Sequence, residues 1–474
     1  MGPFRTFSRR ELLQYTGSGF GTLALSWLMQ SQAGAATAGL NLAPKLPQFP
    51  AKARAVIQLV QNGGPSQMDL FDPKPELTKR NGQRHSEKVE NFQKGSEANL
   101  LMASPFEFRR YGQCGMELSE ALTHTPTIAD QICLIRSMYS EHNNHLEALV
   151  MLQTCKIFPG RPTLGAWISY GLGTENQNLP AYVVLRDPDG YNTSGSLLWE
   201  NGYLPSIYRG TEFNTKGAPV LNLHPAEPFP EGVEKDNLSF LASLNERHRR
   251  HYPLDSDLES RIRNYELAAR MQMAADEVLS IAKESEATRK LYGLDNEDTA
   301  GYGIRCLMAR RLVEAGVRFV QVFPPIKPSV QPWDTHGNTR KDILEIAAKT
   351  EQGATALVKD LKSRGLLEST IVMWAGEFGR LPVSQNGTGR DHNRNAFSLW
   401  LAGGGFRPGL VYGATDDFGY RAVENRVSVP DLHATILNQL GLDHKKLTFP
   451  HNGREETLTD YPLTGAKVVK DLIV

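Results

Sequence analysis

The sequence predicts an α/β protein with a mostly parallel, doubly wound sheet flanked by helices and one irregular insertion. Short apolar or β-branched runs alternate with longer helix-compatible segments over most of the chain, which is typical of repeated strand–helix–strand units. Several short runs end directly in glycine-rich or polar turns, where α/β sheets present their ligand-binding groups. A chain of 474 residues with 40% hydrophobic residues is sufficient for one large core of this kind.

Charge and composition exclude several classes of protein. Lysine plus arginine and aspartate plus glutamate both number 52, so the net charge is zero, and a nucleic-acid partner, which needs a basic surface, is not expected. The chain is too apolar to be disordered. No segment has the roughly 20 consecutive apolar residues of a membrane span. The four cysteines lack a Cys-x-x-Cys pair, which leaves disulfides or buried thiols open, and the oligomeric state is open as well.

Residues 1–35 resemble a twin-arginine export signal. Arg9 and Arg10 precede a weakly apolar segment, and small residues at 33–35 follow it as a cleavage pattern. A short amphipathic helix is the alternative. The signal predicts a periplasmic or extracellular protein. Residues 36–51 contain three prolines and are predicted to form an extended linker.

The remaining chain, residues 52–474, is expected to form one domain. In its first half, hydrophobic runs predict strands at 54–60, 131–136 and 181–186, with a helix at 146–152 after the second strand. Residues 187–230 are rich in Gly, Pro, Asn and Tyr and predict an irregular insertion or cap over the site. Residues 237–291 are charged, with apolar residues at helical spacing, and predict a helical section packed on the core.

The second half continues the alternation of strands and helices. Strands are predicted at 317–323, 370–375 and 397–402, and helices at 341–364 and 430–440. The last helix has Asp431 near its start, where a carboxylate can accept hydrogen bonds from free backbone N–H groups and interacts favourably with the helix dipole.

Polar clusters follow the predicted strands, at residues 62–69, 142–145, 333–336, 376–380 and 389–393. Two of them place an aspartate beside a histidine: Asp334 with His336, and Asp391 with His392. Carboxylate and imidazole donors together suit zinc, manganese or iron better than calcium. A single such pair is more often a structural hydrogen-bonded pair, but clusters at successive strand ends favour a metal centre.

Two arginines flank the same region, Arg380 and Arg390. A guanidinium fork binds phosphate, sulfate or carboxylate oxygens at two points. The alternative is that these arginines form ion pairs with Glu377 or Asp391 and only fix loops. No nucleophile stands out, because Ser66 lacks the Gly-x-Ser-x-Gly elbow and is equally compatible with a turn residue.

Several motifs in a fixed order resemble the domain of unknown function 1501 family, over about residues 52–470. The motifs lie at 62–75, 333–336, 376–380, 389–392, 413–419 and 431–454. The family resembles a branch of the alkaline phosphatase-like superfamily, which includes sulfatases and phosphomutases. The resemblance implies a central sheet flanked by helices, with a metal site at the strand ends.

The resemblance also implies a ligand set. In the superfamily an Asp-x-x-x-His-type motif and a later Asp-His pair bind two metals, so Asp334 and His336 are expected to supply the first set. Glu377 takes the place of the later aspartate, although Phe378 replaces the adjacent histidine. His392 is expected to replace a ligand further along the chain.

Two departures from the superfamily pattern change the expected chemistry. Gly63-Gly64 occupies the turn that carries the first-strand aspartate of the superfamily, and Asp69 is a candidate substitute. Residues 145–154 lack the Cys- or Ser-x-Pro-Ser-Arg signature of sulfatases, so a formylglycine nucleophile is not expected. The candidate ligand loop consists of Asn62, Gly63, Gly64, Ser66 and Asp69.

The resulting expectation is an exported metal-dependent hydrolase of sulfate or phosphate esters, acting on a small-molecule or polysaccharide substrate. One or two divalent ions (zinc, manganese or similar) are expected on Asp334, His336, Glu377, Asp391 and His392. Arg380 or Arg390 would bind the ester oxyanion, and His145 would act as a general acid or an outer donor. The alternative is a non-catalytic exported scaffold that binds polysaccharide or protein through residues 187–230.

Overall fold

The computed structural model describes residues 42–216, 230, 232–252, 256–327 and 331–474. The expected export signal, the first part of the linker and residues 217–229 of the expected insertion lie outside these residues. The described residues divide into two compact units. The larger comprises residues 42–216, 266–327 and 331–474, and the smaller comprises residues 230, 232–252 and 256–265.

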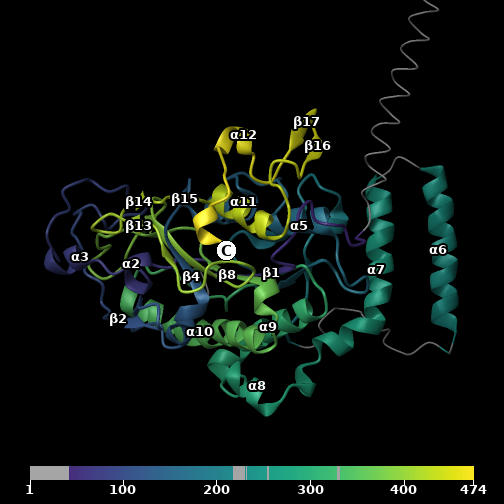
Figure 1. Ribbon diagram of the computed structural model, residues 1–474, viewed down its shortest axis with the longest axis horizontal. Helices are drawn as coiled ribbons and strands as arrows, with labels where there is room; N and C mark the ends of the chain where they lie inside the picture. Colours follow the sequence, from purple (N-terminus) through teal and green to yellow (C-terminus); the bar gives the residue numbers. More distant parts are fainter. Residues whose placement is uncertain (1–41, 217–229, 231, 253–255, 328–330) are drawn as a thin grey trace, which may run out of the picture. The chain divides into compact units, whose positions relative to one another are not determined.

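A nine-stranded mixed sheet forms the centre of the larger unit (Figure 1). The strand order is β12-β4-β11-β8-β1-β7-β5-β6, and β15 also pairs with β4. The strands span β1 Ala55–Val60, β4 Ile132–Tyr139, β5 Tyr182–Leu185, β6 Thr211–Glu212, β7 Phe319–Val322, β8 Thr370–Ala375, β11 Phe397–Ala402, β12 Val411–Tyr412 and β15 Val427–Ser428. All neighbours pair in parallel except β11, which is antiparallel to both β4 and β8. The carboxyl ends of β4, β8, β1, β7 and β5 therefore lie along one edge.

Apolar runs form these strands because both faces of the sheet are covered. Every residue of β1, β8 and β11 is buried, which explains why their sequences are continuous apolar runs and do not alternate. Figure 1 shows α9 and α10 along one face and α5 and α11 along the other. The covering helices are α4 His145–Thr154, α5 Leu164–Leu172, α9 Glu297–Glu314, α10 Thr339–Ser363 and α11 Val429–Gln439.

The described residues also form helices and two-stranded sheets besides the central sheet and its covering helices. The remaining helices are α2 Gln67–Leu70, α3 Pro75–Lys79, α6 Val233–His251, α7 Ser256–Leu279, α8 Glu286–Leu291 and α12 Tyr461–Thr464. Two-stranded sheets pair β2 Phe108–Tyr111 with β3 Met116–Ser119, β9 Gly379–Arg380 with β10 His392–Asn393, β13 Ala414–Thr415 with β14 Ala422–Glu424, and β16 Phe449–His451 with β17 Arg454–Glu456. Short 3-10 turns lie at Thr125–Gln131, Gly195–Trp199, Ser206–Tyr208, Ile281–Lys283, Leu367–Ser369 and Lys470–Leu472.

The predicted α/β class is confirmed, and the differences from the predicted elements have local causes. The antiparallel direction of β11 could not be predicted, because a loop and the β9–β10 hairpin connect it to β8 in place of a helix. The edge strand β6 is only two residues long and has no hydrophobic pattern of its own. At the start of α11, Asp431 and Ser428 form a reciprocal capping box, as its position suggested.

The sequence predicted no membrane span and left the state of the cysteines open. No helix among the described residues has the length and apolar character needed to cross a membrane. All four cysteines lie within the described residues, and all are free: Cys133, Cys155 and Cys306 are buried and Cys114 is exposed. Of the two alternatives for the cysteines, the structure therefore has thiols.

Candidate metal centre

The carboxyl edge of the sheet brings together residues from four separate segments. His145 is the first residue of α4, which follows β4, and Asp334 and His336 lie between β7 and α10. Glu377 directly follows β8, and His392 begins β10. Because these strands point the same way, segments more than a hundred residues apart in sequence meet at one place.

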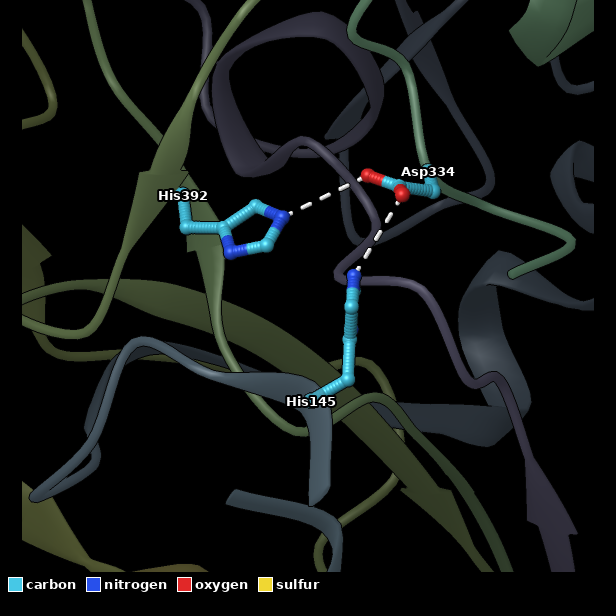
Figure 2. A group of neighbouring side chains, drawn as sticks. All are labelled: His145, Asp334 and His392. Atoms are coloured by element: carbon cyan, nitrogen blue, oxygen red, sulfur yellow. Dashed lines mark hydrogen bonds and ion pairs between the residues drawn. The ribbon is translucent and has the colours of Figure 1, made fainter. Parts of the chain in front are cut away.

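Asp334 is the centre of this group. Its Oδ1 atom lies 3.0 Å from Nε2 of His336 and 3.4 Å from Nε2 of His392. Its Oδ2 atom lies 3.4 Å from Nε2 of His145. Figure 2 shows His145 and His392 turned toward the two carboxylate oxygens. The side chains of Asp334 and His392 are 8% and 1% exposed, whereas His336 is 20% exposed and lies on the solvent side of the group.

Oxygen acceptors fix the tautomers of two of the three histidines. His336 Nδ1 lies 2.5 Å from Gln385 Oε1, and the orientation of that amide is set because its Nε2 donates to the Lys94 carbonyl at 2.8 Å. His392 Nδ1 lies 2.6 Å from the backbone carbonyl of Asn143. Since both acceptors lack a proton, each Nδ1 must donate, and in a neutral ring the Nε2 atom then carries a lone pair. These two lone pairs lie only 2.9 Å apart.

Glu377 orients the third histidine. Its Oε1 atom lies 2.6 Å from Nδ1 of His145, and the carboxylate accepts the backbone N–H groups of Gly63 at 2.9 Å and of Gly64 at 3.3 Å. The buried Nε2 of His145 has no hydrogen-bond partner among the described residues and faces Asp334. Burial alone would lower the pKa of His145, but the hydrogen bonds and charges of Asp334 and Glu377 outweigh it and raise the pKa.

A turn of two glycines provides the backbone N–H groups that bind the Glu377 carboxylate. Gly63 has a φ of 117° and Gly64 a φ of 68°, both in the region that favours glycine. A Cβ atom on Gly63 would lie 2.5 Å from the backbone nitrogen of Trp333, so no side chain fits between the turn and the segment that carries Asp334. The two glycines therefore let backbone N–H groups, in place of a first-strand carboxylate, face Glu377.

Arg380 keeps Asp334 ionised. The guanidinium is fully buried and donates to Asp334 Oδ1 at 2.7 Å, to the Gly64 carbonyl at 2.9 Å, to the Arg390 carbonyl at 3.1 Å and to the Gly63 carbonyl. Burial alone would raise the pKa of Asp334, but the charge of Arg380 and the three imidazoles hold it well below its usual range. Arg380 thus joins the glycine turn to the aspartate.

The donor set fits a divalent metal ion. The Nε2 atoms of His145, His336 and His392 each face the ionised carboxylate of Asp334, and the Nε2 atoms of His336 and His392 are also in contact. Ligand atoms close enough to share one ion form two groups, His145 with Asp334 and His392, and His336 with Asp391 and His392. Two lone pairs at that distance repel each other unless a cation or a proton lies between them. Burial lowers the pKa of His392 to about 3, which disfavours a proton there. Three imidazoles with one carboxylate suit zinc and related transition metals.

Glu377 and Asp391, both expected as ligands, are engaged in other bonds. Asp391 Oδ2 accepts the backbone N–H groups of Phe92 at 2.7 Å and Gln93 at 2.8 Å, and Oδ1 accepts that of His392 at 2.8 Å. Asp391 is nevertheless close enough to His336 and His392 to form a second possible group with them. In the structure its carboxylate secures the loop that carries Phe92 and Gln93 against the histidines.

The ion pairs differ from those that the sequence suggested. Arg380 pairs with Asp334 rather than Glu377, and Arg390 pairs with Asp69 rather than Asp391. Arg390 contacts both oxygens of Asp69, at 2.7 and 3.1 Å, and Ser66 donates its hydroxyl to the same carboxylate at 2.5 Å. Ser66, Asp69 and Arg390 are fully buried. The second half of the expected ligand loop is therefore a buried ion-pair network, while Asn62 donates to Gln331 beside it.

Four further residues contact the histidines, and only Phe378 among them lies in a segment that the sequence singled out. Phe92 stacks on His392 with ring centroids 4.9 Å apart, and Phe378 lies against the same ring at 4.5 Å. Gln93 Nε2 lies 3.1 Å from His336 Nε2. Gln385 and Gln93 are isolated glutamines in loops, and only the folded chain reveals which histidine each one meets.

The fold and the site together define an α/β protein with a group of histidines and an aspartate, able to hold a metal, at the carboxyl edge of a mostly parallel sheet. The chain belongs to the family described as protein of unknown function DUF1501, whose model matches residues 53–473. No curated protein matches the sequence.

Several solved structures align with most of this chain at low sequence identity. The lipoteichoic acid synthase of Listeria monocytogenes is 8% identical over 88% of this chain and 78% of its own, with a TM-score of 0.35. The phosphonate monoester hydrolase of Silicibacter pomeroyi is 11% identical over 88% and 78%, with a TM-score of 0.34. A sulfatase from a Pseudoalteromonas species is 11% identical over 87% and 72%, with a TM-score of 0.35.

Proposed function

We propose that this chain is an exported, metal-dependent hydrolase of sulfate or phosphate esters, with one divalent ion on His145, Asp334, His336 and His392. The observation that carries the proposal is the convergence of three imidazole Nε2 atoms on one ionised carboxylate. Zinc or manganese is the proposed ion. The proposal of one ion, and not two, follows from Glu377 and Asp391, whose oxygens accept hydrogen bonds from the protein.

The residues around the four donors would orient them. A divalent ion in such a site polarises an ester oxygen and lowers the pKa of water. Glu377, Gln385 and the Asn143 carbonyl each hold the far side of one imidazole, which fixes the ring that faces Asp334. Arg380 keeps Asp334 in its charged form. His145, expected as a general acid, is thereby proposed as a ligand.

The two arginines are proposed as structural residues. The donors of Arg380 and Arg390 are directed to carboxylates and backbone carbonyls inside the protein, and both side chains are fully buried. Ser66 donates its hydroxyl to Asp69, so it is not proposed as a nucleophile. Water is the nucleophile that the proposal requires.

Metal content and turnover test the proposal together. The purified chain, its Asp334→Ala/His336→Ala double variant and a His251→Ala control, which alters an exposed histidine on α6, are analysed for bound metal and for hydrolysis of aryl sulfates and aryl phosphates. We expect metal and turnover in the wild type and the control and neither in the double variant. Unchanged metal in the double variant contradicts the assignment of the site.

A non-catalytic exported scaffold with the same metal is the second candidate. The observation that favours it is the engagement of both arginines, which leaves neither guanidinium for an ester oxyanion. Bound metal without turnover of any sulfate or phosphate ester supports the scaffold, whereas turnover that depends on Asp334 excludes it.

A further inference from the structure

A cavity of about 380 Å³ lies along the same edge of the sheet, past the ends of β5 and β7. Its lining includes Asp187 and Asp189 after β5, Pro325 after β7, and Glu297, Asp298, Gly301, Tyr302 and Arg305 from the first half of α9. None of the metal-centre residues lines it. Its volume is within the range of small-molecule sites.

Arg305 is the unusual residue of this cavity. Its side chain is only 2% exposed, and its buried Nε atom has no hydrogen-bond partner among the described residues. Its guanidinium donates a hydrogen bond from Nη2 to Asp187 Oδ2 at 3.3 Å. That carboxylate also accepts the backbone N–H groups of Asp189 at 2.9 Å and Ile326 at 3.3 Å, so it is shared. A guanidinium has five N–H donors, and leaving buried donors without partners is costly.

The charges around Arg305 limit the kind of ligand that the cavity can bind. Lys216 and Lys349 also line the cavity, together with the carboxylates of Asp187, Asp189, Glu297 and Asp298, and Lys349 Nζ lies 3.6 Å from Oε1 of Glu345, which is outside that lining. A simple anion on Arg305 would be repelled by these carboxylates. An anion that also carries hydroxyl groups would donate hydrogen bonds to them, since an ionised carboxylate only accepts.

We propose that this cavity binds an acidic sugar. Its carboxylate or sulfate group pairs with Arg305 and Lys349, and its hydroxyl groups donate to Asp189, Glu297 and Asp298. The proposal goes beyond the hydrolase proposed above and does not depend on it, because binding here needs neither the metal nor a reaction.

Gly301 offers a way to block the cavity without disturbing its walls. It lines the cavity from α9, and a Cβ atom built on it meets no atom within 4 Å. A larger side chain at this position therefore projects into open space. Gly301→Phe adds an aromatic ring at the wall of the cavity, and Gly301→Ala is the matched control, because alanine also replaces the glycine but adds only one methyl group.

Calorimetric titration of the full chain tests the proposal with four probes: glucuronate, glucose 6-sulfate, glucose and acetate. We expect glucuronate, glucose 6-sulfate or both to bind, with glucose and acetate weaker by at least about tenfold, because each lacks one half of the recognition. Binding of only one of the two acidic sugars identifies the anionic group. If glucose binds as tightly as the acidic sugars, Arg305 does not contribute to recognition. If acetate binds as tightly as they do, the carboxylates do not contribute. No binding of either acidic sugar overturns the proposal.

Single substitutions test whether the acidic sugars bind in this cavity. Gly301→Phe is expected to abolish it and Gly301→Ala to retain it, and Lys349→Ala, a change at the rim, should weaken it even if Gly301→Phe fails to fold. The Asp334→Ala variant should bind as the wild type does, which separates this cavity from the metal centre. Acidic-sugar binding that survives in folded Gly301→Phe, is unaffected by Lys349→Ala, or is lost in Asp334→Ala places it elsewhere and overturns the proposal.

Discussion

His336 Nε2 lies 2.9 Å from His392 Nε2, and each ring already donates its Nδ1 proton to an oxygen on its other side. The contact is therefore unfavourable in neutral rings without a cation. The same distance is compatible with both nitrogens facing one metal ion. This pair of histidines, with Asp334 beside both, is the observation that favours the proposed metal site over a structural hydrogen-bond network.

Gln385 is predicted to set metal affinity although it is not a ligand. It holds Nδ1 of His336, so Gln385→Ala frees the ring to rotate or change tautomer. We expect the zinc affinity to fall by roughly 10–100-fold, as is typical when an outer partner of a ligating histidine is lost. Competition with a chromophoric chelator measures it. An unchanged affinity would show that packing alone holds the ring.

Gln93 is predicted to act in the opposite direction. Its Nε2 donates to the His336 Nε2 lone pair at 3.1 Å, and a metal ion must take that same lone pair. Gln93→Ala should therefore bind zinc at least as tightly as the wild type in the same chelator assay. It also serves as the matched control for Gln385→Ala, since both remove one amide from His336. A large loss of affinity in Gln93→Ala would make Gln93 a ligand instead of a competitor.

The Arg390–Asp69 pair is predicted to matter for stability alone. Both side chains are fully buried, so Arg390→Met leaves an ionised carboxylate without its partner. We expect the free energy of unfolding, measured with urea, to fall by about 3–5 kcal/mol. Adding Asp69→Leu to the same chain should recover part of the loss. If Arg390→Met instead abolishes substrate binding in a protein of normal stability, the arginine has the oxyanion role first expected of it.

A buried histidine away from the site predicts how stability depends on pH. Burial lowers the pKa of His433 from 6.5 to about 4, and its Nδ1 lies 3.1 Å from the Cys155 sulfur. Between these two pKa values the unfolded chain binds the proton and the folded chain does not, so stability is complete above pH 6.5 and is lost as the pH falls toward 4. The loss attributable to this residue is about 3 kcal/mol.

The comparison that isolates His433 is with His433→Asn, whose amide nitrogen replaces Nδ1 but does not titrate. Urea unfolding of both proteins at several pH values should give curves that converge toward pH 4, because only the wild type loses this contribution. Parallel curves across the range would mean that His433 does not remain neutral in the folded protein.

Much of the fold follows from local sequence, and the site follows only in part. Strands such as β1 and β8 are buried on both faces, so their sequences are uninterrupted apolar runs, which can be recognised without a structure. Asp334 with His336, and Asp391 with His392, are close in sequence, so the sequence alone indicates both pairs. The division of roles between His145 and Glu377 could not be predicted. It depends on the Gly63-Gly64 turn, whose N–H groups face the glutamate only once β1 and β8 are paired.

X-ray absorption spectroscopy of the zinc-loaded chain at the zinc edge tests the proposed ligand set. We expect one zinc per chain with three imidazole nitrogens at about 2.0–2.1 Å and at least one oxygen ligand. We also expect one imidazole contribution to disappear in His145→Ala, because His145 is proposed as a ligand and not as an outer donor. A spectrum with two or fewer imidazoles that is unchanged by His145→Ala would contradict the proposed ligand set.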